Sequence, residues 1–450
     1  MSAPNTGQFG SRMGFILAAA GSAIGLGNIW RFPYTAGENG GAAFVLVYLG
    51  FVALIGVPVL LAELSMGRAS GKNPVGAFAS LDPKQSKAWP YVGALGVLTG
   101  FGILSFYSVI AGWTLSYLWR AATGEFAAAM SPEQSDVIFK QIISNPGEVV
   151  AMAGLFLLLT AAVVRGGVSG GIERAAKVLM PIFFVVLLVL AARAVTLPGG
   201  EEGLRFLFEP DFSKLSGAAV MSALGQALFS LSLGMGAMIT YGSYLQKKEN
   251  LGLAGLSVAI FDTGIAVLAG LIIFPALFSV GAEPSAGPGL VFVAMPAIFE
   301  QLPAGLAFGV AFYLLLAVAA LTSTMSLLEV VVSYFVGERG WKRETAVWGV
   351  TAGCFLLAIP SALSQGAMEG LELFGQSFLD LMNILFGNIS LSLGALLIAV
   401  FVGWRWGADK ALAEMKSLPG GPLWALAIRY LCPAAVTGVM IYILVTGEFF

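Results

Sequence analysis

The chain has 450 residues, of which 58% are apolar and 11% charged, with a net charge of −2 and a mean hydropathy of +0.88. This balance excludes a soluble enzyme of this size, which needs roughly twice the charged fraction, and a nucleic-acid-binding protein, which needs a basic surplus. The absence of histidine excludes catalytic triads with a His base and His-ligated zinc. The composition predicts an integral membrane protein.

Apolar stretches of about 20 residues, the length that crosses a bilayer as a helix, follow one another along the chain. We identify eleven, at 13–38, 41–69, 89–123, 148–165, 168–195, 217–246, 252–282, 303–336, 344–361, 371–404 and 422–447. Met1 to Ser11 has no signal-peptide pattern. The predicted fold is an all-α integral membrane protein with eleven transmembrane helices.

The distribution of basic residues predicts the orientation. If the N-terminus is cytoplasmic, the inner loops hold 16 of the 23 Lys and Arg residues. This bias follows the positive-inside rule. Because an odd number of spans places the termini on opposite sides, we expect the C-terminus on the extracellular or periplasmic side.

The first and sixth spans carry glycine-rich interruptions at mid-membrane depth. The first contains Gly25-Leu26-Gly27-Asn28, and the sixth contains Gly234-Met235-Gly236 after two serines. Close helix packing is one explanation, because small residues are enriched between membrane helices. Two such spans, five apart, are also typical of transporters built from inverted repeats, in which unwound backbone lines a binding cavity. Free amides there favour a carboxylate, and free carbonyls favour a hard cation such as sodium.

Few ionisable residues lie within the spans, and each is a functional candidate because burying a charge there costs at least ~2.5–3.5 kcal/mol. Glu63 can bind the amides of a broken helix or act as a structural cap. Asp262 in the seventh span is a candidate cation ligand, with snorkelling near the span end as the alternative. Glu329 in the eighth span is interpreted as a vestibule or packing residue. Thr322 and Ser323 offer neutral oxygens for sodium, although such hydroxyls often bond to their own helix.

Several motifs together resemble the neurotransmitter:sodium symporter family. They are Gly21 to Tyr34, Glu38-Asn39-Gly40-Gly41, Glu63 with Gly67-Arg68, Ser232-Leu233-Gly234, Leu321-Thr322-Ser323 and Gly407-Ala408-Asp409-Lys410. The chain looks most similar to the bacterial eleven-helix amino-acid transporters. The resemblance implies a 5+5 inverted repeat with discontinuous helices 1 and 6. The repeats would be 1–196 and 217–407, separated by an extracellular loop at 197–216 and followed by a peripheral helix 11 at 408–450.

The same resemblance implies two sodium sites and a substrate pocket. Sodium ligands would come from Gly21, Ala23, Ile24, Asn28, Ser230, Asp262, Ala319, Thr322 and Ser323. The substrate would contact Ser22, Ala23, Leu26, Gly27, Ile103, Tyr107, Phe229, Ser232, Met235, Ser323 and Leu327. The pocket side chains are all neutral and cannot offset the desolvation of a charged substrate side chain. We therefore expect hydrophobic amino acids, aliphatic and also aromatic.

Chloride use and gating are further expectations from the resemblance. Many bacterial members have a glutamate where this chain has Ala266, but Asp262 replaces the usual Asn sodium ligand and supplies a charge, so chloride-independent transport is expected. The outer gate would pair Arg31 with Asp380 or Asn383. The usual inner ion pair aligns with Thr6 and Gly337 and is absent, with Arg12 nearby. Phe9 would plug the inner side, and Gly171 and Pro181 would mark a segment of the fifth span that unwinds.

The resulting prediction is a sodium-coupled symporter for hydrophobic amino acids that works by alternating access in the bacterial inner membrane. The alternative is a sodium- or proton-coupled transporter of another small zwitterionic solute on the same fold. An enzyme is not expected, because no nucleophile has a base beside it. The expected partners are the amino acid, sodium ions and the lipid bilayer, with no nucleic acid.

Overall fold

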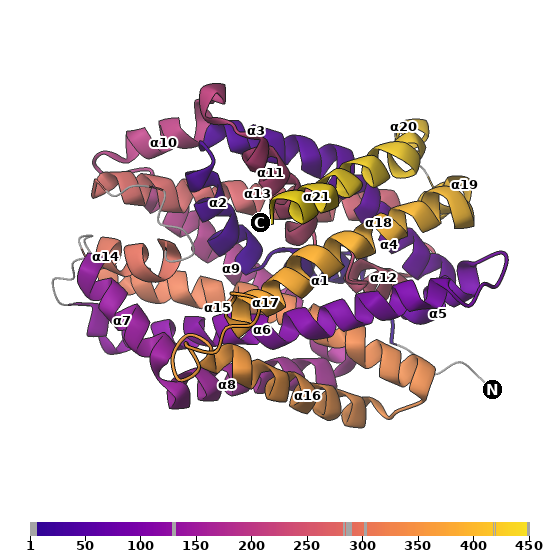
Figure 1. Cartoon of the computed structure of the whole chain (residues 1–450), viewed down its shortest axis with the longest axis horizontal. Helices are drawn as coiled ribbons and strands as arrows, with labels where there is room; N and C mark the ends of the chain where they lie inside the picture. The colour runs from indigo at the N-terminus through magenta and orange to yellow at the C-terminus, as the bar shows by residue number, and fades with distance from the viewer. Residues whose placement is uncertain are drawn as a thin grey trace.

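The computed structural model of the chain is built of helices, most of which run along the longest axis of the molecule (Figure 1). It describes residues 7–127, 132–281, 284, 290–300, 304–416, 418 and 420–447. Within these ranges, β-pairing is limited to an isolated bridge between Leu373 and Gln376. The predicted all-α class is confirmed.

The helices of the first half of the chain lie close to the first five predicted spans. They are α1 (Arg12–Ala23), η1 (Gly27–Arg31), α2 (Phe32–Glu38), α3 (Ala42–Phe51), η2 (Val52–Gly56), α4 (Val57–Ser70), α5 (Pro74–Leu81), α6 (Trp89–Thr123), η3 (Glu125–Ala127), α7 (Pro132–Ser144), α8 (Pro146–Arg165), η4 (Val168–Glu173) and α9 (Arg174–Ala194). Some of these join without interruption, so that α3, η2 and α4 together form one span.

The second half contains the remaining spans and their loops. Its helices are α10 (Gly200–Phe208), η5 (Phe212–Lys214), α11 (Gly217–Ser230), α12 (Ala237–Ser243), α13 (Leu251–Ser279), η7 (Leu290–Ala294), α14 (Met295–Glu300), α15 (Gly305–Arg339), α16 (Arg343–Leu363), α17 (Phe378–Met382), η8 (Asn383–Ser390), α18 (Leu391–Val400), η9 (Phe401–Gly407), α19 (Ala408–Met415), α20 (Gly421–Leu426), η10 (Ala427–Leu431) and α21 (Cys432–Thr446).

The first and sixth spans are interrupted as predicted. In the described chain, nine helices are long and apolar enough to cross a membrane, and α1 forms a further candidate span with η1–α2, bent by 50° at the break. The sixth predicted span is divided into α11 and α12, with residues 231–236 outside any helix. Each half of the chain therefore contains one discontinuous span.

The tenth span begins later and ends later than predicted. It starts at Phe378 instead of residue 371 and continues through η8, α18 and η9 to Met415. The preceding residues Phe374 and Gly375 have φ angles of 56° and 72°, which a right-handed helix cannot contain. Ser377 then caps the new helix by accepting a hydrogen bond from the amide of Asp380.

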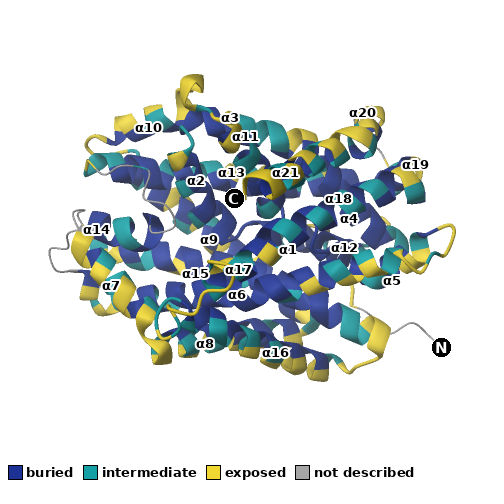
Figure 2. Cartoon of the chain, viewed as in Figure 1, coloured by how far each residue is buried: buried dark blue, intermediate teal, exposed yellow. Residues whose placement is uncertain are grey.

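Spans differ in how deeply they lie in the molecule. In α6, 78% of the most apolar window is buried, and in α15 the fraction is 61%. For the last span, Gly421–Thr446, the fraction is only 28%. Figure 2 shows the buried residues running through the middle of the bundle. The two long helices α6 and α15 therefore form the central wall, and the last span is peripheral.

An ion pair joins the end of α5 to η9, near the end of the tenth span. Asp82 follows the last residue of α5 and is buried. Its carboxylate accepts bonds from Arg405 Nε at 2.6 Å and Nη2 at 3.0 Å, and from the amide of Ser86 at 2.7 Å. Hydrogen bonding from the Arg405 guanidinium lowers the pKa of Asp82 to about 2.

Candidate functional site

The broken segments of the first and sixth spans cross the molecule beside each other. Ile24 leaves α1 with an extended backbone, at a ψ of 100°. In the sixth span Ser232, Gly234 and Gly236 have φ angles of 53°, 81° and 76°. The Ser232 hydroxyl donates to the carbonyl of Ser22 at 3.0 Å. The left-handed backbone ends α11 and re-aims the chain into α12, and the hydroxyl ties the two breaks together.

Glu63 on α4 supports the break in the sixth span. It is fully buried, and its Oε1 accepts a hydrogen bond from the amide of Gly234 at 2.7 Å. A side chain at Gly67, one turn along α4, would overlap the carbonyl oxygen of Ile239 on α12, so the two helices pack backbone to backbone. The two interpretations given to Glu63 describe this same hydrogen bond, in which a carboxylate satisfies an amide freed by the break.

A cluster of polar groups surrounds a buried carboxylate at the first break. Asn28 Nδ2 donates to Asp262 Oδ1 at 2.8 Å and to Ser230 Oγ at 3.1 Å. The Ser230 hydroxyl donates to Asp262 Oδ2 at 2.8 Å. All three side chains are at most 1% exposed. Asp262 lies near the middle of α13, so the snorkelling alternative for this residue is wrong. Ala23, the fourth predicted ligand here, is the buried last residue of α1.

A second cluster of oxygens, without any carboxylate, joins α15 to the same break. The Thr322 hydroxyl lies 2.9 Å from the Ala319 carbonyl and 3.5 Å from the Ile24 carbonyl. The Ser323 hydroxyl lies 3.4 Å from the Ile24 carbonyl. A Cβ on Gly21 would lie 3.2 Å from Thr322 Cβ, so α1 packs tightly on α15 at this glycine. All five predicted contributors to the second cation site therefore lie together.

A small cavity of about 20 Å³ lies between the two broken segments. Its lining residues are Ser22, Ala23, Gly25, Gly27, Ile103, Tyr107, Phe229, Ser232, Met235, Ser323 and Leu327. These include every predicted pocket residue except Leu26, which lies at the edge and donates its amide hydrogen to the Tyr107 hydroxyl at 2.9 Å. This volume is close to that of a single water site, so the cavity is closed around its own side chains.

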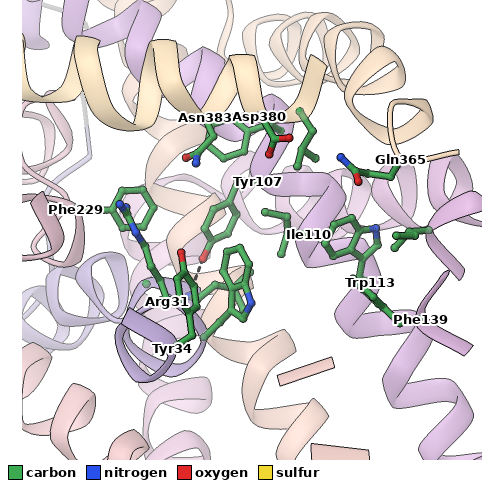
Figure 3. A pocket seen from close by; sticks show the side chains of 16 residues that line it. Arg31, Tyr34, Tyr107, Ile110, Trp113, Phe139, Phe229, Gln365, Asp380 and Asn383 are labelled. Atoms are coloured by element: carbon green, nitrogen blue, oxygen red, sulfur yellow. Dashed lines mark hydrogen bonds between the residues drawn. The ribbon is translucent and has the colours of Figure 1, made fainter. Parts of the chain in front are cut away.

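A larger cavity of about 280 Å³ lies next to the small one. It is lined by Leu26, Gly27, Trp30, Arg31, Tyr34, Phe106, Tyr107, Ile110, Trp113, Phe139, Ile143, Phe229, Gln365, Leu379, Asp380 and Asn383. Figure 3 shows Arg31 beside Phe229, with Asn383 and Asp380 next to each other above them in the view. Tyr107 and Phe229 belong to both linings, so these two rings separate the cavities.

The predicted outer-gate residues meet in this larger cavity. The Arg31 guanidinium carbon lies 4.5 Å from the centre of the Phe229 ring, a cation–π contact. Asp380 accepts a hydrogen bond from the Ser377 hydroxyl at 2.6 Å. Asn383 begins the π-helical segment η8. The structure thus places Asp380 and Asn383 on the same side of the cavity, opposite Arg31.

Aromatic side chains form a cluster beside the start of α1, where the sequence predicts the inner plug. Phe9 is 1% exposed, and its ring makes edge contacts with Phe15, Tyr241 and Tyr244 at centroid distances of 5.5–6.3 Å. Arg12 lies on the surface, and Thr6, which aligns with the usual inner-gate arginine, is outside the described residues. The predicted plug residue therefore lies in a closed aromatic cluster.

The sequence reasoning did not find the ion pair that fastens this end. Glu329 on α15 is fully buried and bonds both guanidinium Nη atoms of Arg343, with an Nη1–Oε1 distance of 3.1 Å. The Tyr244 hydroxyl donates to the same carboxylate at 2.7 Å. Arg343 also donates to the carbonyl of Val164, in the last turn of α8. Glu329 is thus a packing residue that joins four segments, and Arg343 looked like an ordinary positive-inside residue.

Two further polar residues near the first cluster were also missed. The Gln226 side-chain amide donates to the Gly27 carbonyl at 2.8 Å, and the Tyr48 hydroxyl lies 3.3 Å from Ser230 Oγ. Both residues are at most 1% exposed. The sequence carried one usable signal: an amide in the otherwise apolar α11 needs a buried partner.

The predicted gating segment of the fifth span is helical in this structure. Gly171 lies in the π-helical η4, and Pro181 lies inside the continuous helix α9. A Cβ on Gly171 would overlap the Val163 carbonyl oxygen at the end of α8. Gly171 is therefore required for close packing here.

Comparisons with known proteins agree with this arrangement. The profile of the Sodium:neurotransmitter symporter family matches residues 6–135 and 133–448. A sodium-dependent transporter of Bacillus subtilis, YhdH, is 40% identical over 95% of this chain and 96% of its own length. One of Haemophilus influenzae is 37% identical over 96% of each chain. The crystal structure of MhsT in complex with L-phenylalanine superposes with a TM-score of 0.90, at 47% identity over 97% of this chain and 99% of MhsT.

Proposed function

The chain belongs to the sodium:neurotransmitter symporter family, and from this premise we propose that it carries hydrophobic amino acids into the cell together with sodium ions. The family predicted from the sequence is confirmed, and it is a family of sodium-dependent transporters, not of enzymes. The proposal adds the substrate, the ion sites and the direction. It has its main support in the small neutral cavity between the two broken spans.

The substrate assignment rests on the lining of the small cavity. One side offers the Leu26 amide and the Tyr107 hydroxyl, which suit a carboxylate. The rest is apolar or neutral, including Ile103, Phe229 and Met235. A charged side chain would lose its hydration there without a counter-charge, whereas an aliphatic or aromatic one gains from burial. MhsT, which is similar to this chain over nearly its whole length, was crystallised with L-phenylalanine.

Two sodium ions are the proposed co-substrates. Ala23, Asn28, Ser230 and Asp262 would hold the first, together with the carboxylate of the amino acid. The carbonyls of Gly21, Ile24 and Ala319 and the hydroxyls of Thr322 and Ser323 would hold the second. Both sets consist of the oxygen donors that hard cations prefer. Because the first ion would share the substrate carboxylate, sodium and amino acid should bind cooperatively.

The proposed alternating access uses the larger cavity on one side of the breaks and the Phe9 cluster on the other. With the N-terminus in the cytoplasm, the larger cavity faces outward and the Phe9 cluster faces inward. Loading the small cavity would favour closing the outer side around Arg31, Asp380 and Asn383 and opening the inner side at Phe9 and the fifth span. Each sodium ion that enters adds about 2.3 kcal/mol of driving force per 100 mV of membrane potential. Sodium entry can thus drive the amino acid against its gradient.

The proposed organisation places the chain in a bacterial inner membrane. The two repeats would comprise residues 1–196 and 217–407, joined by the loop at 197–216, with the last helix in 408–450 outside the repeat. The N-terminus would be cytoplasmic and the C-terminus periplasmic or extracellular. Labelling of single cysteines introduced at each end, in whole cells with an impermeant reagent, tests the orientation. Reaction of the N-terminal cysteine alone would contradict it.

Chloride independence is proposed from Asp262. Its carboxylate already supplies a negative charge beside the first sodium site, bound by Asn28 and Ser230. Transport should be unchanged when gluconate replaces chloride. Asp262→Asn removes the charge and should abolish transport or make it depend on chloride. Loss of wild-type transport in gluconate would refute this part of the proposal.

Uptake by reconstituted protein tests the main proposal. Proteoliposomes should accumulate radiolabelled L-phenylalanine and L-leucine when sodium is outside. Uptake should stop when potassium replaces the sodium. L-glutamate and L-lysine should not compete. Uptake that is indifferent to sodium would contradict the coupling. Competition by acidic or basic amino acids alone would contradict the pocket, and transport of a different zwitterion would favour another substrate on the same fold.

A further inference from the structure

The N-terminal segment of residues 7–14 lies between two parts of the bundle. On one side, the Phe9 amide donates to the Tyr244 carbonyl at 3.2 Å, and Gln246 Nε2 donates to the Phe9 carbonyl at 2.8 Å. On the other side, a Cβ on Gly7 would lie 3.6 Å from Val168 on η4. The plug is therefore held from the sixth span and from the fifth.

Glu173, at the end of η4, is the polar contact on the fifth-span side. Its carboxylate accepts hydrogen bonds from the Gly10 amide at 2.6 Å and from the Ser11 hydroxyl at 3.0 Å. Lys177, one turn later, pairs with it at 2.6 Å. The Glu173 side chain is 3% exposed, whereas that of Lys177 is 45% exposed. The buried Glu173 carboxylate thus binds the start of α1 as well as Lys177.

The same face of the fifth span reaches the second oxygen cluster. Met180 lies seven residues after Glu173 and therefore on the same side of the helix. It is 1% exposed, and a Cβ on Gly21 would lie 3.1 Å from its sulfur. Gly21 in turn packs on Thr322. The fifth span therefore touches the N-terminal segment through Glu173 and, two turns later, the proposed second sodium site through Met180.

We propose that Glu173 is a positioning residue that latches the N-terminal segment onto the fifth span and so keeps inner water away from the second sodium site. The usual inner-gate ion pair cannot hold the segment here, because one of its two positions is Gly337, which has no side chain. Releasing the latch would withdraw the Phe9 plug and free the segment between Gly171 and Pro181 in one step. The sodium role of the latch rests on the proposed function. The contact between the N-terminal segment and the fifth span does not.

Two variants break the latch from opposite sides. Glu173→Gln removes the charge, and its matched control is Glu344→Gln, a 61% exposed carboxylate paired with Arg165 at 2.7 Å. Gly14→Ala leaves the carboxylate intact but puts a Cβ onto it, since that atom would overlap Glu173. Gly14 lies inside α1, where alanine favours the helix, so the effect is steric. Gly7→Ala, with an ordinary contact, is its control.

Hydrogen–deuterium exchange of the full-length protein, in the presence of sodium, measures whether the two latched segments loosen together. Both latch variants should raise exchange in two peptides together, residues 7–16 and 168–181, by about tenfold, the factor expected for losing one strong hydrogen bond. The two controls should exchange like the wild type. Faster exchange in residues 7–16 alone, with 168–181 unchanged, would overturn the proposal. So would a wild-type pattern for Gly14→Ala, which covers the case in which Glu173→Gln fails to fold.

Sodium titration then tests the link to the ion site. The apparent sodium Kd for phenylalanine binding should rise about five- to tenfold in both latch variants and not in the controls. If exchange rises in both peptides but the sodium Kd is unchanged, the latch has no role at the sodium site. Absence of sodium-dependent phenylalanine binding in the wild type would instead refute the proposed function, and the exchange comparison would still decide whether Glu173 joins the two segments.

Discussion

The two oxygen clusters at the breaks differ in charge. The first contains the buried carboxylate of Asp262, with Asn28 and Ser230 donating to it. The second is made of carbonyls and the hydroxyls of Thr322 and Ser323. Burying a charge at this depth costs at least ~2.5–3.5 kcal/mol, so the first cluster is the more expensive of the two. In the proposed scheme the charged cluster would hold the first sodium ion and the neutral cluster the second.

The largest expected effect is the removal of the charged group. Asp262→Ala leaves the Asn28 amide and the Ser230 hydroxyl without their buried acceptor and removes the charge that faces the cation. We expect sodium-dependent phenylalanine binding to fall at least about 100-fold. A scintillation proximity assay over a sodium titration measures it. A variant that binds within a few-fold of wild type would mean that both clusters work through dipoles alone.

The neutral cluster should respond less strongly to the loss of one oxygen. Thr322→Val keeps the shape of the side chain and removes one hydroxyl, which should raise the apparent sodium Kd about tenfold. Thr324→Val is the matched control, because the Thr324 hydroxyl pairs with Thr160 on α8 at 2.8 Å and faces away from the cluster. Equal effects of the two variants would point to helix packing instead of ion binding.

A third buried carboxylate tests whether charge alone makes a cation site. Glu63→Gln keeps an oxygen that can accept from the Gly234 amide but removes the charge. We expect Tm to fall by about 2–4 °C, with the sodium Kd unchanged, because Glu63 supports the break and does not face the ion. Differential scanning fluorimetry and the same titration separate the two readouts. A sodium Kd that rises as much as in Thr322→Val would give Glu63 a part in ion binding.

The smallest effect concerns the ion pair between Asp82 and Arg405. The lowered pKa of Asp82, about 2, means that its stabilising contribution is complete above the ordinary Asp pKa of about 4 and is lost as the pH falls toward 2. Between pH 7 and 5, the contribution of this ion pair to Tm should not change with pH. Asp82→Asn should show the same Tm-against-pH slope as wild type in that window, with Tm lower by about 1 °C throughout. A slope that differs between the two proteins would contradict this assignment.

Much of the fold was predictable because a bilayer imposes a simple length rule. Helix ends lie within a few residues of most predicted spans. Both interrupted spans carry Gly-x-Gly beside polar residues at the break, whereas Gly100-Phe101-Gly102 leaves α6 unbroken. The site residues were named through family resemblance, and the structure brings them together: Asn28 with Asp262, Ile24 with Thr322 and Ser323, and Tyr107 with Leu26. Their roles in binding remain predictions.

What escaped the sequence depends on pairings between distant residues. Arg343 has the same local context as other basic residues at span ends, and only the approach of α15 gives it Glu329. Glu173 lies near the start of the predicted fifth span, and nothing in the sequence pairs it with the N-terminal segment that folds onto it. The start of the tenth span was misplaced because residues 371–377 are partly apolar, and hydropathy does not register the left-handed backbone at Phe374.

Phe229 is a shared wall, and this sets a rule for volume. The small cavity holds about 20 Å³, too little for an isobutyl or benzyl group, while its neighbour holds about 280 Å³. Phe229 and Tyr107 line both cavities, and the edge of the Phe229 ring would lie 3.1 Å from a Cβ on Gly27. A guest of that size therefore needs one of the shared side chains, Phe229 or Tyr107, to move toward the larger cavity. Any space that the small cavity gains in this way is space that the larger cavity loses.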